Sequence, residues 1–333
     1  MVKKLIVAVG FLAVAAALAV AFFAFAPGGS SARTFVVVKP GTPTRAIARQ
    51  LESAGVIRSE YAFLFVHAAQ GRRTLKAGEY LFDHPASAVE VYGRMARGDV
   101  YYHTVVIPEG YNMFDIAQAL ETAGLAKRND FLNVATRERE LIADLAPQAS
   151  SLEGYLFPDT YHFSRTQNAR DLAAAMVKRF RQEAQALGLT GNLHRLVTMA
   201  SIVEKETSVP AERPLVAGVF ENRLARRIAL ATDPSVIYAA LLAGRYQGAG
   251  IIRQSDLAFD SPYNTYRYAG LPPGPIANPG RASLEAAMRP FTTDYLYFVA
   301  NNQGGHNFAK TLDEHNRNVA EYRRGLAAAN ANK

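Results

Sequence analysis

Residues 36–55 read VVVKPGTPTRAIARQLESAG, and the same pattern returns at residues 105–124 as VVIPEGYNMFDIAQALETAG. The offset is a constant 69 residues without gaps. Each copy starts with β-branched residues, which favour a strand, and passes a glycine. Apolar residues at i, i+4 and i+7 then predict a helix that ends at a second glycine. Two copies are too few for a solenoid. We therefore expect two related strand–helix units that pair their strands with each other.

The segment between the two copies completes a small module. Its pattern predicts a helix over 60–69, a strand over 77–82, a helix over 89–97 and a strand over 101–107. A strand–helix–helix–strand unit of this size resembles a LysM-type carbohydrate-binding module. We expect this LysM-like α+β module to comprise residues 30–104.

Residues 105–333 predict a larger mixed α+β domain, which includes the second strand–helix unit at 105–145. Tyr295 to Ala300 and His306 to Ala309, joined by Gly304-Gly305, predict a β-hairpin. Thr311 and Glu314 have capping-box spacing at the start of a last helix. The other predicted helices are 172–187, 196–207, 216–224 and 235–242. The stripe expected to be buried in the last helix is Leu312, Val319, Tyr322 and Leu326. This order of elements indicates an α+β fold rather than a doubly wound sheet.

The chain begins with an apolar segment. The 22 residues from Leu5 to Ala26 include no charged side chain, which is long enough for a transmembrane helix, and Lys3-Lys4 predicts a cytoplasmic N-terminus. A cleaved signal peptide is the alternative, since Ala24-Phe25-Ala26 has the small-x-small pattern of a cleavage site. The length of the run and Pro27 favour an uncleaved anchor. Residues 1–29 are thus expected to form a cytoplasmic tip, an anchor and a linker, with the rest outside the cytoplasmic membrane.

Composition narrows the chemistry. The chain has no cysteine, which excludes thiol catalysis and zinc–thiolate sites. The net charge of +8 is spread along the chain. Outside the membrane we expect no nucleic-acid partner, and anionic headgroups or an acidic wall polymer fit a basic surface better.

Several common active-site motifs are missing from the sequence. It contains no Gly-Lys-Ser/Thr phosphate loop and no Gly-x-Ser-x-Gly elbow. The histidines never have the i, i+4 spacing of helical metal ligands, and we expect them to be surface residues or hydrogen-bonded core residues. They are His67, His84, His103, His162, His194, His306 and His315. We expect no metal and no cofactor, which leaves carboxylate chemistry.

Two carboxylates lie in the stretch Met199-Ala200-Ser201-Ile202-Val203-Glu204-Lys205-Glu206-Thr207. A carboxyl group held among aliphatic side chains has a raised pKa and can donate a proton near neutral pH. Both glutamates follow mostly apolar residues at helical spacing, so spacing alone does not choose between Glu204 and Glu206. The alternative is that both are surface glutamates of an amphipathic helix.

Other candidate site residues lie in loops. The stretch from Glu153 to Tyr161 is dense in groups that stack on sugars and form hydrogen bonds with them. Asp233 precedes a predicted helix, where it is either a site residue or a helix-start residue. Residues 262–280 are rich in proline and glycine and predict a stiff wall, suited either to shaping a groove or to closing the domain.

Together these stretches resemble one family, the endolytic murein transglycosylases or YceG-like proteins. The matching stretches are Glu153–Tyr161, Met199–Thr207, Val219–Leu224, Thr232–Tyr238, Tyr263–Gly280 and Tyr295–Phe308. The resemblance implies a lyase of the bacterial inner membrane with a periplasmic catalytic domain. Such an enzyme cuts peptidoglycan glycan strands internally, leaves 1,6-anhydro-N-acetylmuramic acid ends and is proposed to terminate strand elongation. Peptidoglycan synthases are then candidate partners.

The resemblance also implies site residues. It assigns catalysis to Glu204, which would protonate the glycosidic oxygen and then accept a proton from the C6 hydroxyl. Tyr263 and Asn264 resemble the Tyr-Asn pair that lytic transglycosylases place opposite their glutamate. Further expected substrate-binding residues are Asp233, Asn222, Tyr155 and Glu153. Two other functions stay open. One is a glycoside hydrolase that uses Glu204 with Asp233, and the other is a catalytically silent anchor that binds wall glycan or a synthase through the LysM-like module.

Overall fold

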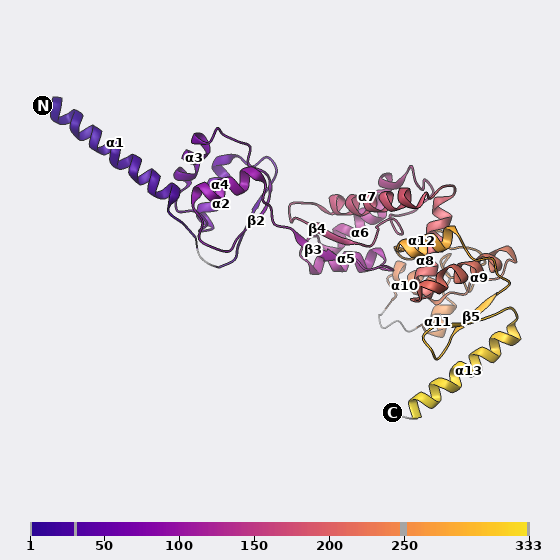
Figure 1. The fold of residues 1–333 in the computed structure, drawn as a ribbon. Coiled ribbons are helices and arrows are strands. Elements are labelled where there is room, and N and C mark those ends of the chain that lie inside the picture. The colour runs from indigo at the N-terminus through magenta and orange to yellow at the C-terminus, as the bar shows by residue number, and fades with distance from the viewer. Residues whose placement is uncertain (1, 30–31, 247–251, 332–333) are drawn as a thin grey trace. The chain divides into compact units, whose positions relative to one another are not determined.

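The computed structural model describes residues 2–29, 32–246 and 252–331, and it confirms a mixed α+β chain that is about half helical. The chain divides into two compact units (Figure 1). The first unit comprises residues 1–105 with 123–125 and 162–168, and the second comprises 106–122, 126–161 and 169–333. In the described ranges the strands form small two-stranded sheets rather than one large sheet.

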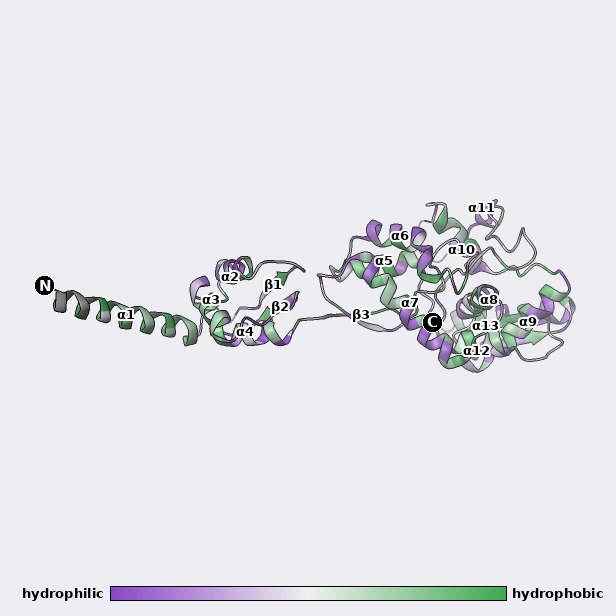
Figure 2. Cartoon of the chain, turned by 90° about the horizontal axis from the view of Figure 1, so that it is seen from above, coloured by the Kyte–Doolittle hydropathy of each residue, from purple (hydrophilic) through white to green (hydrophobic). Residues whose placement is uncertain are grey.

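The first helix, α1 (Val2–Phe25), is long and apolar. Its segment Val7–Phe25 has a mean hydropathy of 2.6, and hydrophobic residues follow one another along it (Figure 2). Most of this segment is exposed, but Ala24 near its end is 1% exposed and belongs to the hydrophobic core of the first unit. By length and composition α1 is consistent with a single membrane span or with a signal sequence.

The rest of the first unit packs three helices against a two-stranded sheet. Strand β1 (Thr34–Val38) pairs antiparallel with β2 (Gly78–Phe82), with Val36 opposite Tyr80. The helices are α2 (Thr44–Ser53), α3 (Glu60–Ala69) and α4 (Ala88–Arg97). The predicted strands and helices of this segment are confirmed. Its core is built from alternate strand residues and from the inner faces of the three helices.

The repeat is confirmed as local structure, but the predicted pairing of its strands is wrong. Strand β3 (His103–Val106) leads into α5 (Met113–Thr122) as β1 leads into α2, and the turn glycines Gly41 and Gly110 both have a positive φ. However, β3 pairs with β4 (Thr160–Phe163), whereas β1 pairs with β2. Each strand pairs with a later strand, because the helices between the two strands return the chain to the side of the first. Similarity between the two repeat strands therefore did not decide the pairing.

The second unit is mostly helical. Its remaining helices are α6 (Arg128–Arg137), η1 (Arg139–Ile142), α7 (Ala169–Leu187), α8 (Leu193–Glu206), η2 (Pro210–Glu212), α9 (Arg213–Ala225), α10 (Asp233–Leu242), α11 (Gln254–Leu257), α12 (Arg281–Met288) and α13 (Leu312–Ala331). Helix α8 packs against α9, α10 and α12 (Figure 1). Met199, Ile202 and Val203 of α8 are buried in a core with residues of these neighbours. Burial on several sides fixes the direction of α8 and hence of the carboxylates at its end.

The C-terminal part of the second unit combines a hairpin with a long helix. Strands β5 (Tyr297–Ala300) and β6 (His306–Ala309) form the predicted hairpin, and Thr311 and Glu314 form the predicted capping box of α13. The predicted buried stripe of α13 is wrong at both ends, since Leu312 and Leu326 are exposed. The reason is length: α13 packs on β5 and β6, and these four-residue strands cover only part of a 20-residue helix.

Candidate active site

The two candidate glutamates lie at the C-terminal end of α8. The side chain of Asn192 caps the start of this helix by accepting a hydrogen bond from the Arg195 backbone N–H. Glu204 and Glu206 are two residues apart, which places their side chains about 160° apart around a helix axis. They therefore face different surroundings.

Glu204 forms a buried ion pair. Its side chain is 5% exposed, and Oε1 accepts a hydrogen bond from Arg213 Nη2 at 2.8 Å. Oε2 accepts a second one from the Gly280 backbone N–H at 2.9 Å. Both carboxylate oxygens are thus engaged, and together they tie the end of α8 to the starts of α9 and α12.

A further carboxylate lies beside this pair. Glu109 Oε2 is 3.7 Å from Arg213 Nη2, and the Glu109 side chain is about half exposed. Burial raises the pKa of Glu109, and the negative charge of Glu204 raises it further, while Arg213 opposes the shift. Arg213 therefore contacts two carboxylates, Glu204 at 2.8 Å and Glu109 at 3.7 Å.

Glu206 faces a pocket. The cavity has a volume of about 400 Å³ and is lined by Glu206, Phe220, Arg223, Leu230, Ala231, Thr232, Asp233, Tyr266, Tyr297, Phe298, Leu312 and His315. Glu206 Oε1 is buried and has no hydrogen-bond partner among the described residues. Burial raises the pKa of Glu206 to about 7; the charge of Asp233 adds to this shift and Arg223 opposes it. A carboxyl group in this state holds a proton near neutral pH and can release it.

The polar groups around Glu206 are held in place by their own contacts. Arg223 donates hydrogen bonds to the backbone carbonyls of Leu296 and Leu230 and lies over the ring of Tyr297. Asp233 accepts a hydrogen bond from the Tyr266 hydroxyl at 2.6 Å. The pocket thus combines a carboxyl group of raised pKa, a second carboxylate, a fixed cation and aromatic rings, and its carboxyl groups can carry out acid–base chemistry.

His315 completes the wall from α13. Its ring stacks on Tyr297, and its Nδ1 is buried without a hydrogen-bond partner in the part of the chain that the structure describes. Burial, and then the charge of Arg223, lower the pKa of His315. The imidazole is therefore neutral at pH 7 and can form a hydrogen bond with a neutral ligand group.

The raised pKa of Glu206 predicts a pH-dependent effect on stability. The folded chain holds a proton on Glu206 that the unfolded chain loses above about pH 4.5, so this group stabilises the fold at low pH and the contribution is lost as pH rises through about 7. Glu206→Gln should therefore unfold at a higher urea concentration than the wild type at pH 8.5. The gain should shrink towards pH 5.

Glu314→Gln is the control of opposite sign. The backbone N–H groups of Lys310 and Thr311 lower the pKa of Glu314, so the glutamate stabilises the fold above its unfolded pKa. This variant should lose stability at neutral pH, with a difference that fades in acid. A Glu206→Gln effect that does not change with pH would contradict the prediction for Glu206.

Of the residues that the sequence predicted for substrate binding, Asp233 lines the Glu206 pocket. Tyr263 is half-buried and its ring lies 5.2 Å from that of Tyr238. Asn264 is buried, and its amide donates to the backbone carbonyls of Leu257 and Phe259. Tyr263 and Asn264 belong to a folded loop beside α10.

The other three predicted residues are engaged inside the unit. Asn222 donates to the carbonyls of Thr293 and Tyr295. The Tyr155 hydroxyl lies 3.0 Å from His194 Nδ1. Glu153 is buried, and burial raises its pKa to about 7. Its oxygens accept hydrogen bonds from the Met113 N–H, the Tyr238 hydroxyl and the Asn278 amide.

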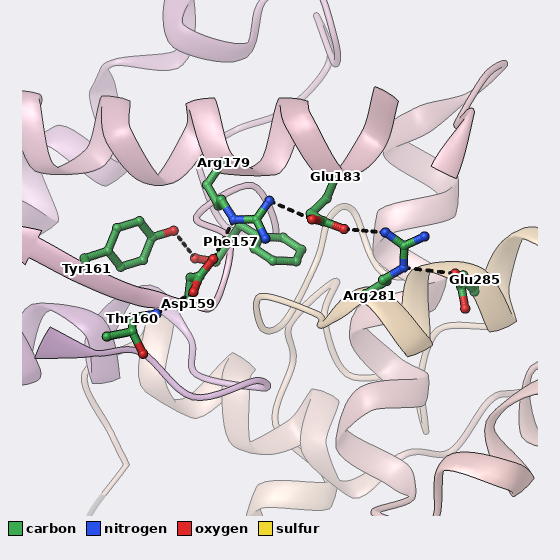
Figure 3. A network of polar contacts seen from close by, with 8 residues as sticks. All are labelled: Phe157, Asp159, Thr160, Tyr161, Arg179, Glu183, Arg281 and Glu285. Atoms are coloured by element: carbon green, nitrogen blue, oxygen red, sulfur yellow. Dashed lines mark hydrogen bonds and ion pairs between the residues drawn. The ribbon is translucent and has the colours of Figure 1, made fainter. Parts of the chain in front are cut away.

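The aromatic stretch from Glu153 to Tyr161 continues into a polar network (Figure 3). Arg179 lies over the Phe157 ring and contacts both Asp159 and Glu183. Glu183 also binds Arg281, which pairs with Glu285. These contacts link this stretch to α7 and α12, so its charged groups are used in holding the second unit together.

Sequence reasoning missed several residues of the pocket. Arg223 and Tyr266 lie in stretches that resemble the family, but nothing in their spacing assigned them to one cavity. His315 was expected to be a surface or hydrogen-bonded core residue. Among the described residues its buried Nδ1 has no partner and its ring lines a pocket, which corrects that expectation. Its position four residues after the capping threonine Thr311 carried no signal of this role.

Comparison with known proteins identifies the family of this chain. The sequence profile of the YceG-like family matches residues 36–321. A protein of Bacillus subtilis named endolytic murein transglycosylase is 34% identical over 307 residues, covering 86% of this chain and 83% of that protein. A protein of the same name from Streptococcus pneumoniae is 32% identical over 320 residues, covering 86% of this chain and 58% of the relative.

A solved structure supports the same relationship. The crystal structure of a YceG-like protein from Listeria monocytogenes is 35% identical in sequence and covers 86% of this chain and 99% of its own, with a TM-score of 0.55. The family profile runs through both units, including the whole of the α8 segment and the pocket around Glu206. This chain belongs to the YceG-like family.

Proposed function

We propose that this chain is an endolytic lytic transglycosylase that cuts the bond between N-acetylmuramic acid and N-acetylglucosamine within peptidoglycan strands. Its relatives carry the name endolytic murein transglycosylase. The observation that carries the proposal is Glu206, a carboxyl group with a pKa of about 7 in a pocket of about 400 Å³ that also contains aromatic and charged side chains. These features suit acid–base cleavage of a glycan.

Within this proposal, Glu206 rather than Glu204 is the acid. Family resemblance favoured Glu204, and that prediction stays open to test. Against it, Glu204 accepts hydrogen bonds from a guanidinium and from a backbone N–H, as a carboxylate does. Glu206 has a buried oxygen with no partner among the described residues, and the raised pKa that a proton donor needs. We therefore assign the structural ion pair to Glu204 and the chemistry to Glu206.

In the proposed reaction a single carboxyl group, that of Glu206, carries out both proton transfers. Glu206 gives its proton to the glycosidic oxygen as the bond to C1 of the muramic residue breaks, and an oxocarbenium-like centre develops there. The C6 hydroxyl of the same sugar then attacks C1 and returns its proton to the Glu206 carboxylate. The proton balance closes without a water molecule, and the nucleophile is already held beside its target. The products are a 1,6-anhydro end and a free 4-hydroxyl.

The neighbouring side chains have supporting roles in this scheme. Asp233 lines the same pocket, where its charge adds to the effect of burial on the pKa of Glu206 and would stabilise a developing positive centre. Neutral His315 and Tyr266 offer hydrogen bonds to sugar hydroxyl or N-acetyl groups. Tyr263 and Asn264 remain predicted substrate residues, and their loop would act by shaping the site beside α10.

A second candidate function is a glycoside hydrolase. Two carboxyl groups, Glu206 and Asp233, line one pocket, and a hydrolase uses such a pair. The two functions differ in their products. We expect the full-length chain, purified in detergent and given intact glycan strands, to release fragments with 1,6-anhydro ends. Mass spectrometry of the fragments checks this, and reducing N-acetylmuramic acid ends would instead establish the hydrolase.

We propose further that α1 is an uncleaved anchor in the inner membrane, with the N-terminus in the cytoplasm and both units in the periplasm. Ala24 supports retention, because it is packed in the core of the first unit. The pairing of Gly28 with Ala86 extends this connection beyond the helix end. An anchored enzyme would meet glycan strands as synthases extrude them, which agrees with a role in terminating strand elongation.

A further inference from the structure

Helix α3 (Glu60–Ala69) is apolar on its exposed face as well as on its buried face. Ala62, Phe63 and Val66 point into the core of the first unit. On the outer face Tyr61 is 69% exposed and Phe65, one turn later, is 55% exposed. A surface helix normally carries polar residues on its outer face. Two exposed aromatic rings at i, i+4 spacing thus form an apolar outer face that the described residues of the first unit leave exposed.

Helix α3 lies beside the end of α1. Arg58, just before α3, donates a hydrogen bond to the carbonyl of Pro27, just after α1. Helices α1 and α3 pack against each other, and both views show α3 next to the C-terminal end of α1 (Figure 1, Figure 2). Ala24 of α1 joins the same core as Phe63 and Val66. This contact reaches into the apolar segment Val7–Phe25.

The charges around α3 suit the edge of a bilayer. Arg58 precedes the helix, and Arg72 and Arg73 follow it, all exposed. Glu60 is the one acidic residue between Arg58 and Arg73, and its buried carboxylate pairs with Arg49. An apolar helix with arginines at both ends can insert its aromatic side chains into the acyl region of the bilayer, while the guanidinium groups stay among the lipid headgroups.

We propose that α3 is an interfacial helix, whose Tyr61 and Phe65 insert into the outer surface of the membrane that α1 crosses. The inference rests on the proposed anchor. A span that ends at Phe25 puts the packing partner of Ala24 at the depth where tyrosine and other aromatic side chains gather in membranes. The first unit is then fixed to the membrane by two elements rather than by a flexible tether, which limits the orientations that it can take.

The chain contains no tryptophan, so the fluorescence of a single introduced tryptophan reports on its own position alone. We would make Tyr61→Trp and Phe65→Trp in the full-length chain, insert each variant into vesicles with brominated acyl chains, and measure quenching of the single tryptophan. The matched control is Tyr102→Trp, since Tyr102 is 51% exposed and lies in the segment that joins α4 to β3, far along the chain from α1 and α3. Phe11→Trp, within α1, reports on the anchor itself.

We expect brominated lipid to quench the two α3 variants, Tyr61→Trp and Phe65→Trp, at least twofold more than Tyr102→Trp. The Phe11→Trp variant should be quenched by lipid as strongly as the α3 variants. Aqueous acrylamide should instead quench Tyr102→Trp most.

Each other outcome overturns a defined part of the proposal. If lipid quenches Phe11→Trp while both α3 variants behave like Tyr102→Trp, the anchor stands and the interfacial helix is overturned. If the α3 variants are shielded from both quenchers, a protein contact covers α3 and the lipid proposal fails. If lipid does not quench Phe11→Trp, the anchor and the inference fail together, while glycan cleavage is still tested separately by its products.

Discussion

Glu206→Gln is expected to reduce the rate of glycan cleavage by about 10²–10⁴-fold, the contribution that a positioned general acid–base group typically makes. Glutamine keeps the shape of the side chain but can neither donate the proton to the glycosidic oxygen nor accept one from the C6 hydroxyl. Because Glu206 transfers a proton in both steps of the proposed reaction, the substitution slows both steps. The measurement is the initial rate of anhydro-ended product release by the full-length chain.

Glu204→Gln is the matched control. The change is the same and lies on the same helix turn, but it removes a charge from the Arg213 ion pair instead of the pocket. Loss of that charge should lower stability while a folded sample keeps most of its rate. Circular dichroism at the assay temperature confirms that both variants are folded. A folded Glu204→Gln chain without activity, beside an active Glu206→Gln chain, would return the catalytic role to Glu204.

The pH dependence of kcat/KM for the wild-type chain tests the proposed role of Glu206 independently. Glu206 must be protonated before substrate binds, so kcat/KM should fall as pH rises above about 7. Glu204→Gln should keep this falling limb, because its substitution leaves the Glu206 pocket intact.

Gly154→Ala is expected to lower the stability of the second unit strongly, because the added methyl group meets both backbone strain and close packing. Gly154 has a φ of +88°, and a Cβ there would lie 2.5 Å from Pro275 Cγ and 2.8 Å from Val197 Cγ1. The left-handed backbone costs about 1–2 kcal/mol for a residue with a side chain, and overpacking adds about 1–3 kcal/mol. We expect a loss of about 2–5 kcal/mol in the free energy of unfolding, the sum of these two costs, measured by urea denaturation.

Gly188→Ala separates the two causes. Gly188 also has a positive φ, +65°, but an added Cβ would meet no heavy atom within 4 Å. This variant should lose about 1–2 kcal/mol, the backbone part alone. Equal losses in the free energy of unfolding at both glycines would show that the close packing of the loop against Pro275 and α8 does not contribute to stability.

Much of the local structure follows from the sequence alone. The periodicity of apolar residues predicted the bounds of α3, and the constant offset of the repeat predicted two strand–glycine–helix segments. The spacing of Thr311 and Glu314 predicted the start of α13, and the Gly304-Gly305 turn predicted the hairpin. These features depend on interactions between residues that are close in the chain, such as caps, turns and the alternation of buried positions, so the sequence determines them directly.

The tertiary structure decided which strands pair and which glutamate faces a pocket. Sequence similarity favoured pairing the two repeat strands, but chain return through the helices produced β1–β2 and β3–β4 instead. Glu204 and Glu206 have equivalent apolar neighbours along α8. They differ because Arg213 and Gly280, distant in sequence, close around Glu204, whereas Asp233, Arg223 and His315 meet around Glu206. A pKa depends on burial and on charges brought together by folding, which no spacing within one helix encodes.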